Sequence, residues 1–263
     1  MGSRPTYPEP VAELPASVRT ALWTTDAWTR GLSLDGLWDR ALPDVDAVGG
    51  STASLSAWGD LGERGLFVAL PHSGHPRVLP RCSADALADV TRAEECLFSP
   101  MLGGLLVPEP TTFGPGDGTD LDSGHRIDWT FHDSEPLAVH VVTGLDVRDT
   151  RRRLLETVLS TTVELEAVGG APLPSRDVSP PQRRDEGLGL PHGIPEACLA
   201  GIATAALVAE ASAMALGAPP DGVTLGHVVE RDRLLRSLLR AADSAIEDFT
   251  NIAVSVIAGW RPA

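Results

Sequence analysis

Lysine is absent from this sequence. All 21 basic residues are arginine, and asparagine and glutamine occur once each, at Asn251 and Gln182. The codons of these rare residues are mostly rich in A and T, so the pattern indicates a GC-rich genome and need not reflect selection of arginine for anion binding. With 36 acidic residues the formal net charge is −15, which repels phosphate backbones and anionic lipid surfaces. We therefore expect neither nucleic acid nor a membrane as a partner.

Cysteine is also scarce. Cys82, Cys96 and Cys198 are an odd number, and no two of them form a CxxC pair. A disulfide scaffold is excluded and a reducing compartment is favoured. Residues 1–14 are polar and proline-rich, without the basic-then-apolar pattern of a signal peptide. We expect a flexible N-terminus and a cytoplasmic protein.

The motifs of common enzymes are missing as well. No GxSxG or SxxK sequence displays a nucleophile, and no P-loop or GxGxxG sequence indicates nucleotide binding. A composition with 43% hydrophobic and 22% charged residues is nevertheless that of a folded globular protein. Our leading functional prediction is a non-catalytic cytoplasmic binding or interaction protein, without a cofactor and able to self-associate.

The hydrophobic pattern predicts an α+β fold, with a small mostly antiparallel sheet, flanking helices and a C-terminal helical hairpin. Residues 66–70 form a short apolar run typical of a buried strand. In residues 126–131, Ile127, Trp129 and Phe131 alternate with polar residues, which predicts a strand with one buried face. We expect this strand to form a hairpin with residues 137–142.

The chain divides by composition into four parts. Residues 1–14 precede an α+β body at 15–168, whose last helix is expected against the sheet with one apolar stripe at Leu154, Leu155, Val158, Thr162 and Leu165. Residues 169–193 are rich in proline, glycine and charge and form a linker or a long loop. Residues 194–263 are the helical hairpin.

The hairpin begins with an apolar segment at 197–216 that is long enough to span a bilayer. It consists largely of alanine, and Glu210 would cost about 2–3 kcal/mol near a membrane centre, so we predict a buried helix of a soluble protein. The amphipathic helix after it, at about 224–257, covers one flank only. We therefore predict a homodimer through these two helices, and Ala206→Arg and Ala213→Arg are the substitutions expected to disrupt it.

His72 and His75 raise the question of a metal site. Three residues apart across Ser73 and Gly74, they could both reach one ion, or they could belong to a plain tight turn. Zinc needs three or four protein ligands, so further ligands would come from Asp120 and Asp122 in the acidic loop at 117–122. This gives the alternative function, a metal-assisted hydrolase with a divalent metal such as zinc.

A small-molecule site is the third possibility. Trp129 on the apolar face of the predicted strand could line a pocket, with Arg126 and His132 as polar contacts from the same strand. The competing interpretation is that Trp129 belongs to the core.

Three segments carry a resemblance to known proteins. They are LFVALPHSGHPRVLP at 66–80, FGPGDG at 113–118 and WTFHDSEP at 129–136. Together they resemble a group of uncharacterised proteins from high-GC actinobacteria, over residues 60–165. The resemblance implies an α+β body and a GC-rich source, and it implies no activity and no residue roles.

Overall fold

The computed structural model describes residues 14–72, 78–114, 124–137, 144–168, 188–218 and 225–262. These residues form seven helices and five strands, which confirms the α+β prediction. In chain order the elements are α1 (Ala16–Thr29), α2 (Leu37–Ala41), β1 (Ala47–Gly50), α3 (Ala53–Asp60), β2 (Phe67–Ala69), α4 (Ala84–Ala93), β3 (Cys96–Phe98), β4 (Leu105–Phe113), β5 (Gly124–His132), α6 (Val147–Val168), α7 (Glu196–Gly217) and α8 (Leu225–Ile257).

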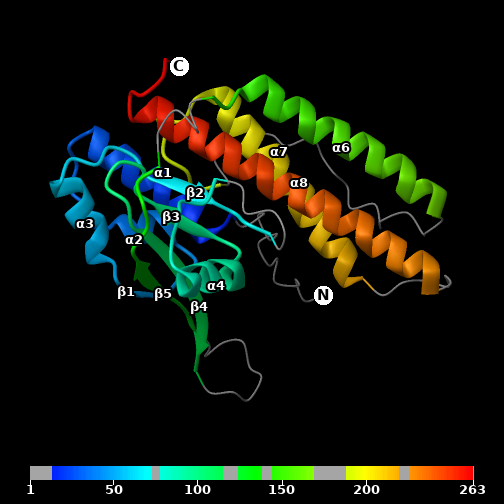
Figure 1. The fold of residues 1–263 in the computed structure, drawn as a ribbon, viewed down its shortest axis with the longest axis horizontal. Coiled ribbons are helices and arrows are strands. Elements are labelled where there is room, and N and C mark those ends of the chain that lie inside the picture. Colours follow the sequence, from blue (N-terminus) through cyan, green and yellow to red (C-terminus); the bar gives the residue numbers. More distant parts are fainter. Residues whose placement is uncertain are drawn as a thin grey trace, which may run out of the picture.

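The five strands form one sheet in the order β1-β5-β4-β3-β2. Every neighbouring pair is antiparallel except β1 and β5, which are parallel. The smaller helices α1 to α4 surround the sheet, and α6, α7 and α8 form a long helical layer that extends past it (Figure 1). The sheet is therefore mostly antiparallel, as predicted.

The predicted hairpin between 126–131 and 137–142 is wrong. β5 pairs with β4 along its whole length and with β1 on its other side, so both of its edges are occupied. Leu137 donates its amide to the carbonyl of Pro100 instead, and residues 138–142 lie outside the described residues. The true partner of β5 is β4, and its residues Pro108 and Pro110 argue against a strand when only the sequence is considered. These prolines lie beyond the short pairing with β3, where a missing N–H costs no ladder bond.

Trp129 and Phe131 differ in burial, although the alternation predicted both to be buried. Trp129 is buried, and its indole stacks on Trp38 with ring centroids 6.1 Å apart. Phe131 is 39% exposed and contacts the ring of Trp58 at the surface. The alternation of apolar and polar residues predicts on which face of the sheet a side chain lies. The hydrophobic core, however, does not cover the whole of that face.

Phe131→Ala is accordingly expected to lower the free energy of unfolding by only about 1–2 kcal/mol, since a half-exposed ring loses less apolar contact than a buried one. The matched control is Phe67→Ala, because Phe67 is fully buried in β2 and its loss should cost about 3–5 kcal/mol. Urea denaturation of the two variants measures the difference. Equal losses would contradict the assigned exposure.

β2 lies at an edge of the sheet, and its outer side is closed by side chains. The backbone N–H and C=O groups of Phe67 and Ala69 point towards β3. The amides of the alternate residues Leu66, Val68 and Leu70 therefore point outward, away from the sheet. Each donates to a side-chain oxygen: Leu66 to Thr25 Oγ1 at 3.1 Å, Val68 to Asn251 Oδ1 at 2.8 Å, and Leu70 to Glu247 Oε2 at 2.8 Å. The described residues 78–81, which follow this run in the chain, form no strand beside it.

Asn251, the only asparagine of the chain, makes two of the bonds at this edge. Its Oδ1 accepts from the amide of Val68, and its Nδ2 donates to the carbonyl of Val68 at 2.9 Å. Asn251 and Glu247 are one turn apart on α8 and both are buried. One face of α8 thus takes the place of a sixth strand.

The three long helices pack on one another. α7 and α6 both lie along α8, which runs between α6 and the sheet in Figure 1. The α7–α8 contact is close, because a Cβ built on Gly201 would stand 2.6 Å from the ring of Phe249. The expectation that the 149–168 helix packs against the sheet is therefore wrong. Its predicted stripe is also displaced, since Leu154 is buried while Leu155 and Thr162 are exposed.

Among the described helices, α7 alone has the length and hydropathy of a membrane span. A third of its apolar window is buried, mainly through residues that face α8 such as Cys198, Ile202 and Ala205. Core helices of soluble proteins share these two properties, and we retain the soluble-core interpretation as a prediction. Ala206, chosen above as a dimer contact, is buried within the chain, whereas Ala213 is exposed.

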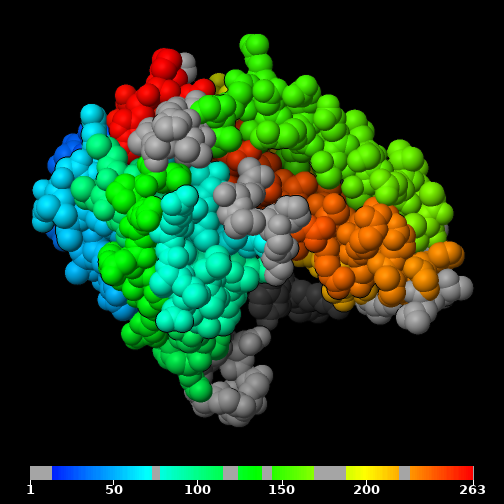
Figure 2. Space-filling model, in the orientation of Figure 1, coloured from blue at the N-terminus to red at the C-terminus, as the bar shows by residue number. Residues whose placement is uncertain are grey.

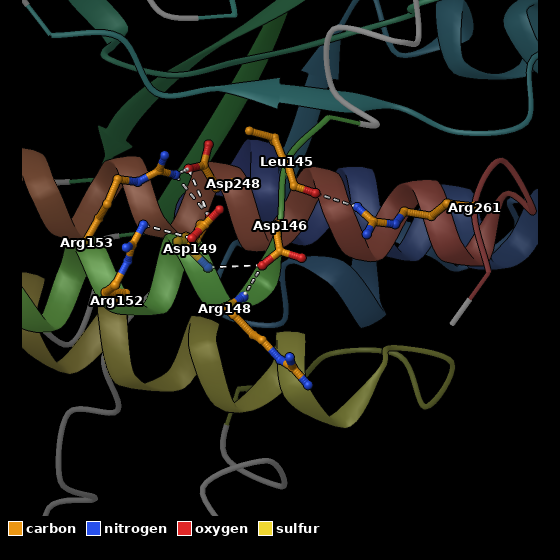
Figure 3. A network of polar contacts seen from close by, with 9 residues as sticks. Leu145, Asp146, Arg148, Asp149, Arg152, Arg153, Asp248 and Arg261 are labelled. Carbon is orange, nitrogen blue, oxygen red and sulfur yellow. Dashed lines mark hydrogen bonds and ion pairs between the residues drawn. The ribbon is translucent and has the colours of Figure 1, made fainter.

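Two arginines at the start of α6, Arg152 and Arg153, pair with acidic side chains (Figure 3). Arg153 donates to Asp248 of α8 at 2.8 Å, and Arg152 donates to Asp149 at 2.8 Å. Asp146 accepts from the first amides of the helix and thereby caps it. Cations in the first turns of a helix oppose its dipole, so a nearby carboxylate is favourable there. For Arg153, another helix supplies this carboxylate.

Candidate functional site

A cleft of about 700 Å³ lies where several elements meet. The start of α1, the end of β2, the end of α4, strands β4 and β5, and α8 all contribute to its walls. Its polar and charged lining residues are Arg19, Asp44, His72, Glu94, Glu95, Thr111, Thr112, His125, Arg126 and Asp243. Leu14, Val45, Leu70 and Ile127 are among its apolar residues. A second pocket, of about 210 Å³, has only Asp89, Arg92 and Glu109 as charged lining residues.

His72 and Asp243 form one wall of the cleft. His72 Nε2 lies 2.9 Å from Asp243 Oδ2, and both side chains are largely buried. The hydrogen bond to Asp243 raises the pKa of His72 above its ordinary value, against the opposing effect of burial. Asp243, Glu247 and Asn251 follow one another at four-residue intervals on α8, so the face that closes β2 continues to His72.

This pair predicts a pH-dependent stability. The pKa of folded His72 is raised, so its contribution is complete below the unfolded value of about 6.5 and is lost as the pH rises through the folded value. Asp243→Asn is expected to cost about 1–2 kcal/mol near pH 6 and less near pH 8.5. The measurement is the free energy of unfolding by urea of both proteins across this range. A difference that stays constant with pH would refute the assignment.

Arg19 and Asp44 form a second ion pair in the cleft. Both guanidinium NH2 groups bond the carboxylate, one of them at 3.1 Å. Burial works to raise the pKa of Asp44, but the bond and charge of Arg19 outweigh it, so the pKa is lowered. The Nε of Arg19 is buried and has no hydrogen-bond partner among the described residues.

Glu95, beside this pair, caps α1. Its Oε2 accepts the amide of Ser17 at 2.7 Å, at a helix start where Pro15 offers no side-chain cap. Burial raises the pKa of Glu95, and the bonds from α1 oppose that shift. Glu95 is therefore a structural group, and Glu94 next to it is the exposed carboxylate of the cleft.

The three residues predicted to bind a ligand do not come together. Arg126 lines the cleft and bonds Asp128 at 2.6 and 2.7 Å. Trp129 lies in the core, and His132 Nε2 is 3.1 Å from Asp89 of α4, away from the cleft lining. A role for Trp129 or His132 in ligand binding stays a prediction.

The predicted metal ligands are only partly visible. His72 lines the cleft, while His75, Asp120 and Asp122 lie outside the described residues. Within the described ranges, no three His, Cys, Asp or Glu residues are placed to hold one ion. His72 offers only Nδ1 to a metal as long as Nε2 bonds Asp243. The metal-site prediction therefore depends on residues 73–77 and 115–123.

None of the three thiols is ready for nucleophilic chemistry at neutral pH. Burial raises the pKa of Cys198 to about 11, and it raises the pKa of Cys96 further and that of Cys82 as well. The thiolate is the reactive form of cysteine, and a raised pKa removes it. Cysteine-based catalysis has no support in these side chains.

Sequence reasoning missed most of the cleft. Asp243 is separated from His72 by 171 positions, and Arg19 and Asp44 come from two further segments. One signal was present: Asp243, Glu247 and Asn251 recur every fourth residue beside the apolar stripe of the last helix. Polar residues at that spacing next to a buried stripe indicate groups that meet a backbone edge or an ion partner.

Family models match most of the chain. The N-terminal domain of the Rv1486c-like proteins matches residues 17–142, and their C-terminal domain matches residues 148–247. No curated protein and no solved structure matches the chain. The first match contains the sheet, and the second contains α6, α7 and most of α8. The chain therefore belongs to the Rv1486c-like proteins and carries both of their domains.

Proposed function

We propose that this member of the family is a non-catalytic cytoplasmic binding protein whose cleft holds a small polar ligand. The observation that carries the proposal is the composition of the cleft, where charged groups line a space of about 700 Å³. Ligand sites typically have volumes of about 300–1,000 Å³ and a few convergent polar groups. Arg19 and His72 are already paired with Asp44 and Asp243, an arrangement that suits orientation of a ligand more than attack on it.

The charges of the cleft favour a ligand with groups of both signs. Four carboxylates line it, from Asp44, Glu94, Glu95 and Asp243, and they would repel a polyanion such as a nucleoside triphosphate. Arg126 can still donate to one anionic group. A zwitterion of amino-acid type, with its ammonium group near Glu94, matches both features.

Thermal unfolding with a library of amino acids and small zwitterions tests the proposal. A ligand present at about 100 times its Kd should stabilise the protein by about 2.7 kcal/mol, which is a shift of several degrees in Tm. Arg126→Ala should abolish this shift. Arg236→Ala is the matched control, because Arg236 is equally a surface arginine in an ion pair but lies outside the cleft lining. Absence of any stabilising compound, or loss of the shift in both variants, would overturn the proposal.

A metal-assisted hydrolase is the second candidate. It is favoured by the presence of His72 and Asp243 together in the cleft, since imidazole and carboxylate are common zinc ligands. Its remaining ligands would be His75 and carboxylates of the 117–122 loop. Metal analysis of purified, untagged protein decides: one zinc or manganese per chain, lost in His72→Ala, would replace the binding-protein proposal.

Two further parts of the proposal concern source and assembly. The lysine-free, GC-biased composition supports a high-GC actinobacterial source. Self-association is retained as part of the proposal, although the exposed apolar residues favour α6 over the C-terminal helical hairpin as its surface.

A further inference from the structure

The outer face of α6 carries an apolar stripe that no part of the described chain buries. Leu155, Leu159 and Val163 are 43%, 68% and 66% exposed. They are spaced by four residues, so they follow one face of the helix. The opposite face is the one that buries Leu154 and Thr161. α6 therefore has a second apolar face, directed away from the molecule.

This stripe ends in opposite charges. Arg152 stands three residues before Leu155, and Glu166 stands three residues after Val163, so both continue the same face of the helix. Arg148, one turn before Arg152, reinforces the positive end. The face is basic at the start of α6, apolar in its middle and acidic at its end.

The order of these residues is symmetric about Leu159. Leu155 and Val163 lie four positions on either side of it, and Arg152 and Glu166 lie seven positions on either side. We propose that two copies of the chain pair antiparallel through α6, with a two-fold axis at Leu159. Leu159 then meets its own copy, Leu155 meets Val163 of the other chain, and Arg152 meets Glu166 of the other chain. A two-fold interface requires a patch that complements itself. This stripe meets the requirement, because apolar residues face apolar residues and opposite charges face each other across the axis.

A second copy fits this face better than other occupants do. Glu166 on the face, together with the net charge of −15, disfavours an anionic membrane surface. The exposed part of α7 is lined mainly by alanine, which offers little apolar area for the dimer predicted from the sequence. α6 also forms the outer rim of the helical layer, where a second molecule can approach (Figures 1 and 2). The inference is independent of ligand binding in the cleft.

The size of the face sets the expected affinity. The proposed contact runs from Arg152 to Glu166, and an α-helix rises about 1.5 Å per residue, so the contact is about 21 Å long. One helix pair buries less than the roughly 800 Å² per partner of a standard interface. We therefore expect a dimer with a micromolar Kd. Over protein concentrations of about 5–500 μM, the dimer should be populated in the upper part of the range.

Sedimentation equilibrium over that range tests the dimer. The wild-type mass should rise from 27.7 kDa towards twice that value, and Leu159→Glu should weaken association at least tenfold, because it places two carboxylates together on the axis. Val229→Glu is the matched control, since Val229 is a 61% exposed apolar residue of α8 outside the stripe. It should leave the Kd unchanged. Circular dichroism checks that each variant retains its helix content.

A charge exchange tests the antiparallel register. Arg152→Glu and Glu166→Arg should each weaken the dimer several-fold, since each places like charges opposite one another. The double variant should regain most of the wild-type affinity, because the two charges are then exchanged across the axis. A wild-type protein that stays monomeric, a dimer insensitive to Leu159→Glu, or a double variant without recovery would overturn the proposal.

Discussion

Asn251→Leu is expected to lower the free energy of unfolding by about 3–5 kcal/mol. Asn251 gives Val68 of β2 both an acceptor for its amide and a donor for its carbonyl, and all these groups are buried. Leucine has a similar volume but no hydrogen-bonding atoms, so two buried backbone groups lose their partners at once. Each such group costs about 1–3 kcal/mol when left unpaired. Urea or guanidinium denaturation, followed by tryptophan fluorescence, measures the loss.

Thr250→Val is the matched control for this substitution. Thr250 is the neighbouring buried residue on α8, and its hydroxyl has no hydrogen-bond partner among the described residues. Replacing an unpaired hydroxyl by a methyl group of the same shape is expected to change stability by less than about 1 kcal/mol. If the two variants lose the same stability, the loss reflects helix packing, and the role given to the Asn251 amide is wrong.

Gly50→Ala should have an effect of similar size, about 3–5 kcal/mol, for a steric reason. Gly50 ends β1 with φ of 78°, and a Cβ at this position would stand 2.2 Å from the carbonyl oxygen of Trp129 in β5. Backbone atoms of a central strand cannot move aside cheaply, and the same carbonyl accepts the amide of Ser51. The substitution therefore separates the only parallel pair of the described sheet. Thermal and chemical denaturation of the purified variant measure the loss.

Gly31→Ala isolates the contribution of backbone conformation to that effect. Gly31 has a similar φ of 64°, but a Cβ there has no neighbour within 4 Å. Its replacement is expected to cost only about 1–2 kcal/mol, the strain of a left-handed residue with a side chain. A Gly50 variant no less stable than the Gly31 variant would show that β1 is not held as tightly against β5 as the register implies.

The parts of the fold that sequence reasoning predicted are those with a strong local pattern. The apolar run at 66–70, the alternation at 126–131 and the amphipathic last helix were all placed correctly. β1 was missed, because four residues that include Gly49 and Gly50 show no alternation and pair with a strand nearly eighty positions away. The full length of β4 has no clear signal in the sequence, since Pro108 and Pro110 interrupt the strand pattern. Local pattern determines which residues form an element, while partners depend on distant contacts.

The candidate site was predictable to a smaller extent. His72 and Arg126 were selected and do line the cleft, but for roles that depended on neighbours in sequence. The structure pairs His72 with Asp243 and Arg126 with Asp128, and only the second pair is local. A cleft built from six elements leaves no spacing signature. The sequence signal that did point to the cleft was the four-residue recurrence of Asp243, Glu247 and Asn251.

The closure of the β2 edge by α8 has a consequence for how the chain folds during synthesis. β2 and its sheet belong to the N-terminal family domain, whereas Glu247 and Asn251 belong to α8, which is synthesised well after the sheet. Until α8 arrives, the apolar edge of residues 66–70 has open hydrogen-bonding groups, which is the template that strand aggregation uses. The N-terminal domain made alone would keep that edge exposed permanently. In this chain, α8 therefore protects the sheet to which it is covalently attached from aggregation, and the sheet and α8 depend on each other as a folding unit.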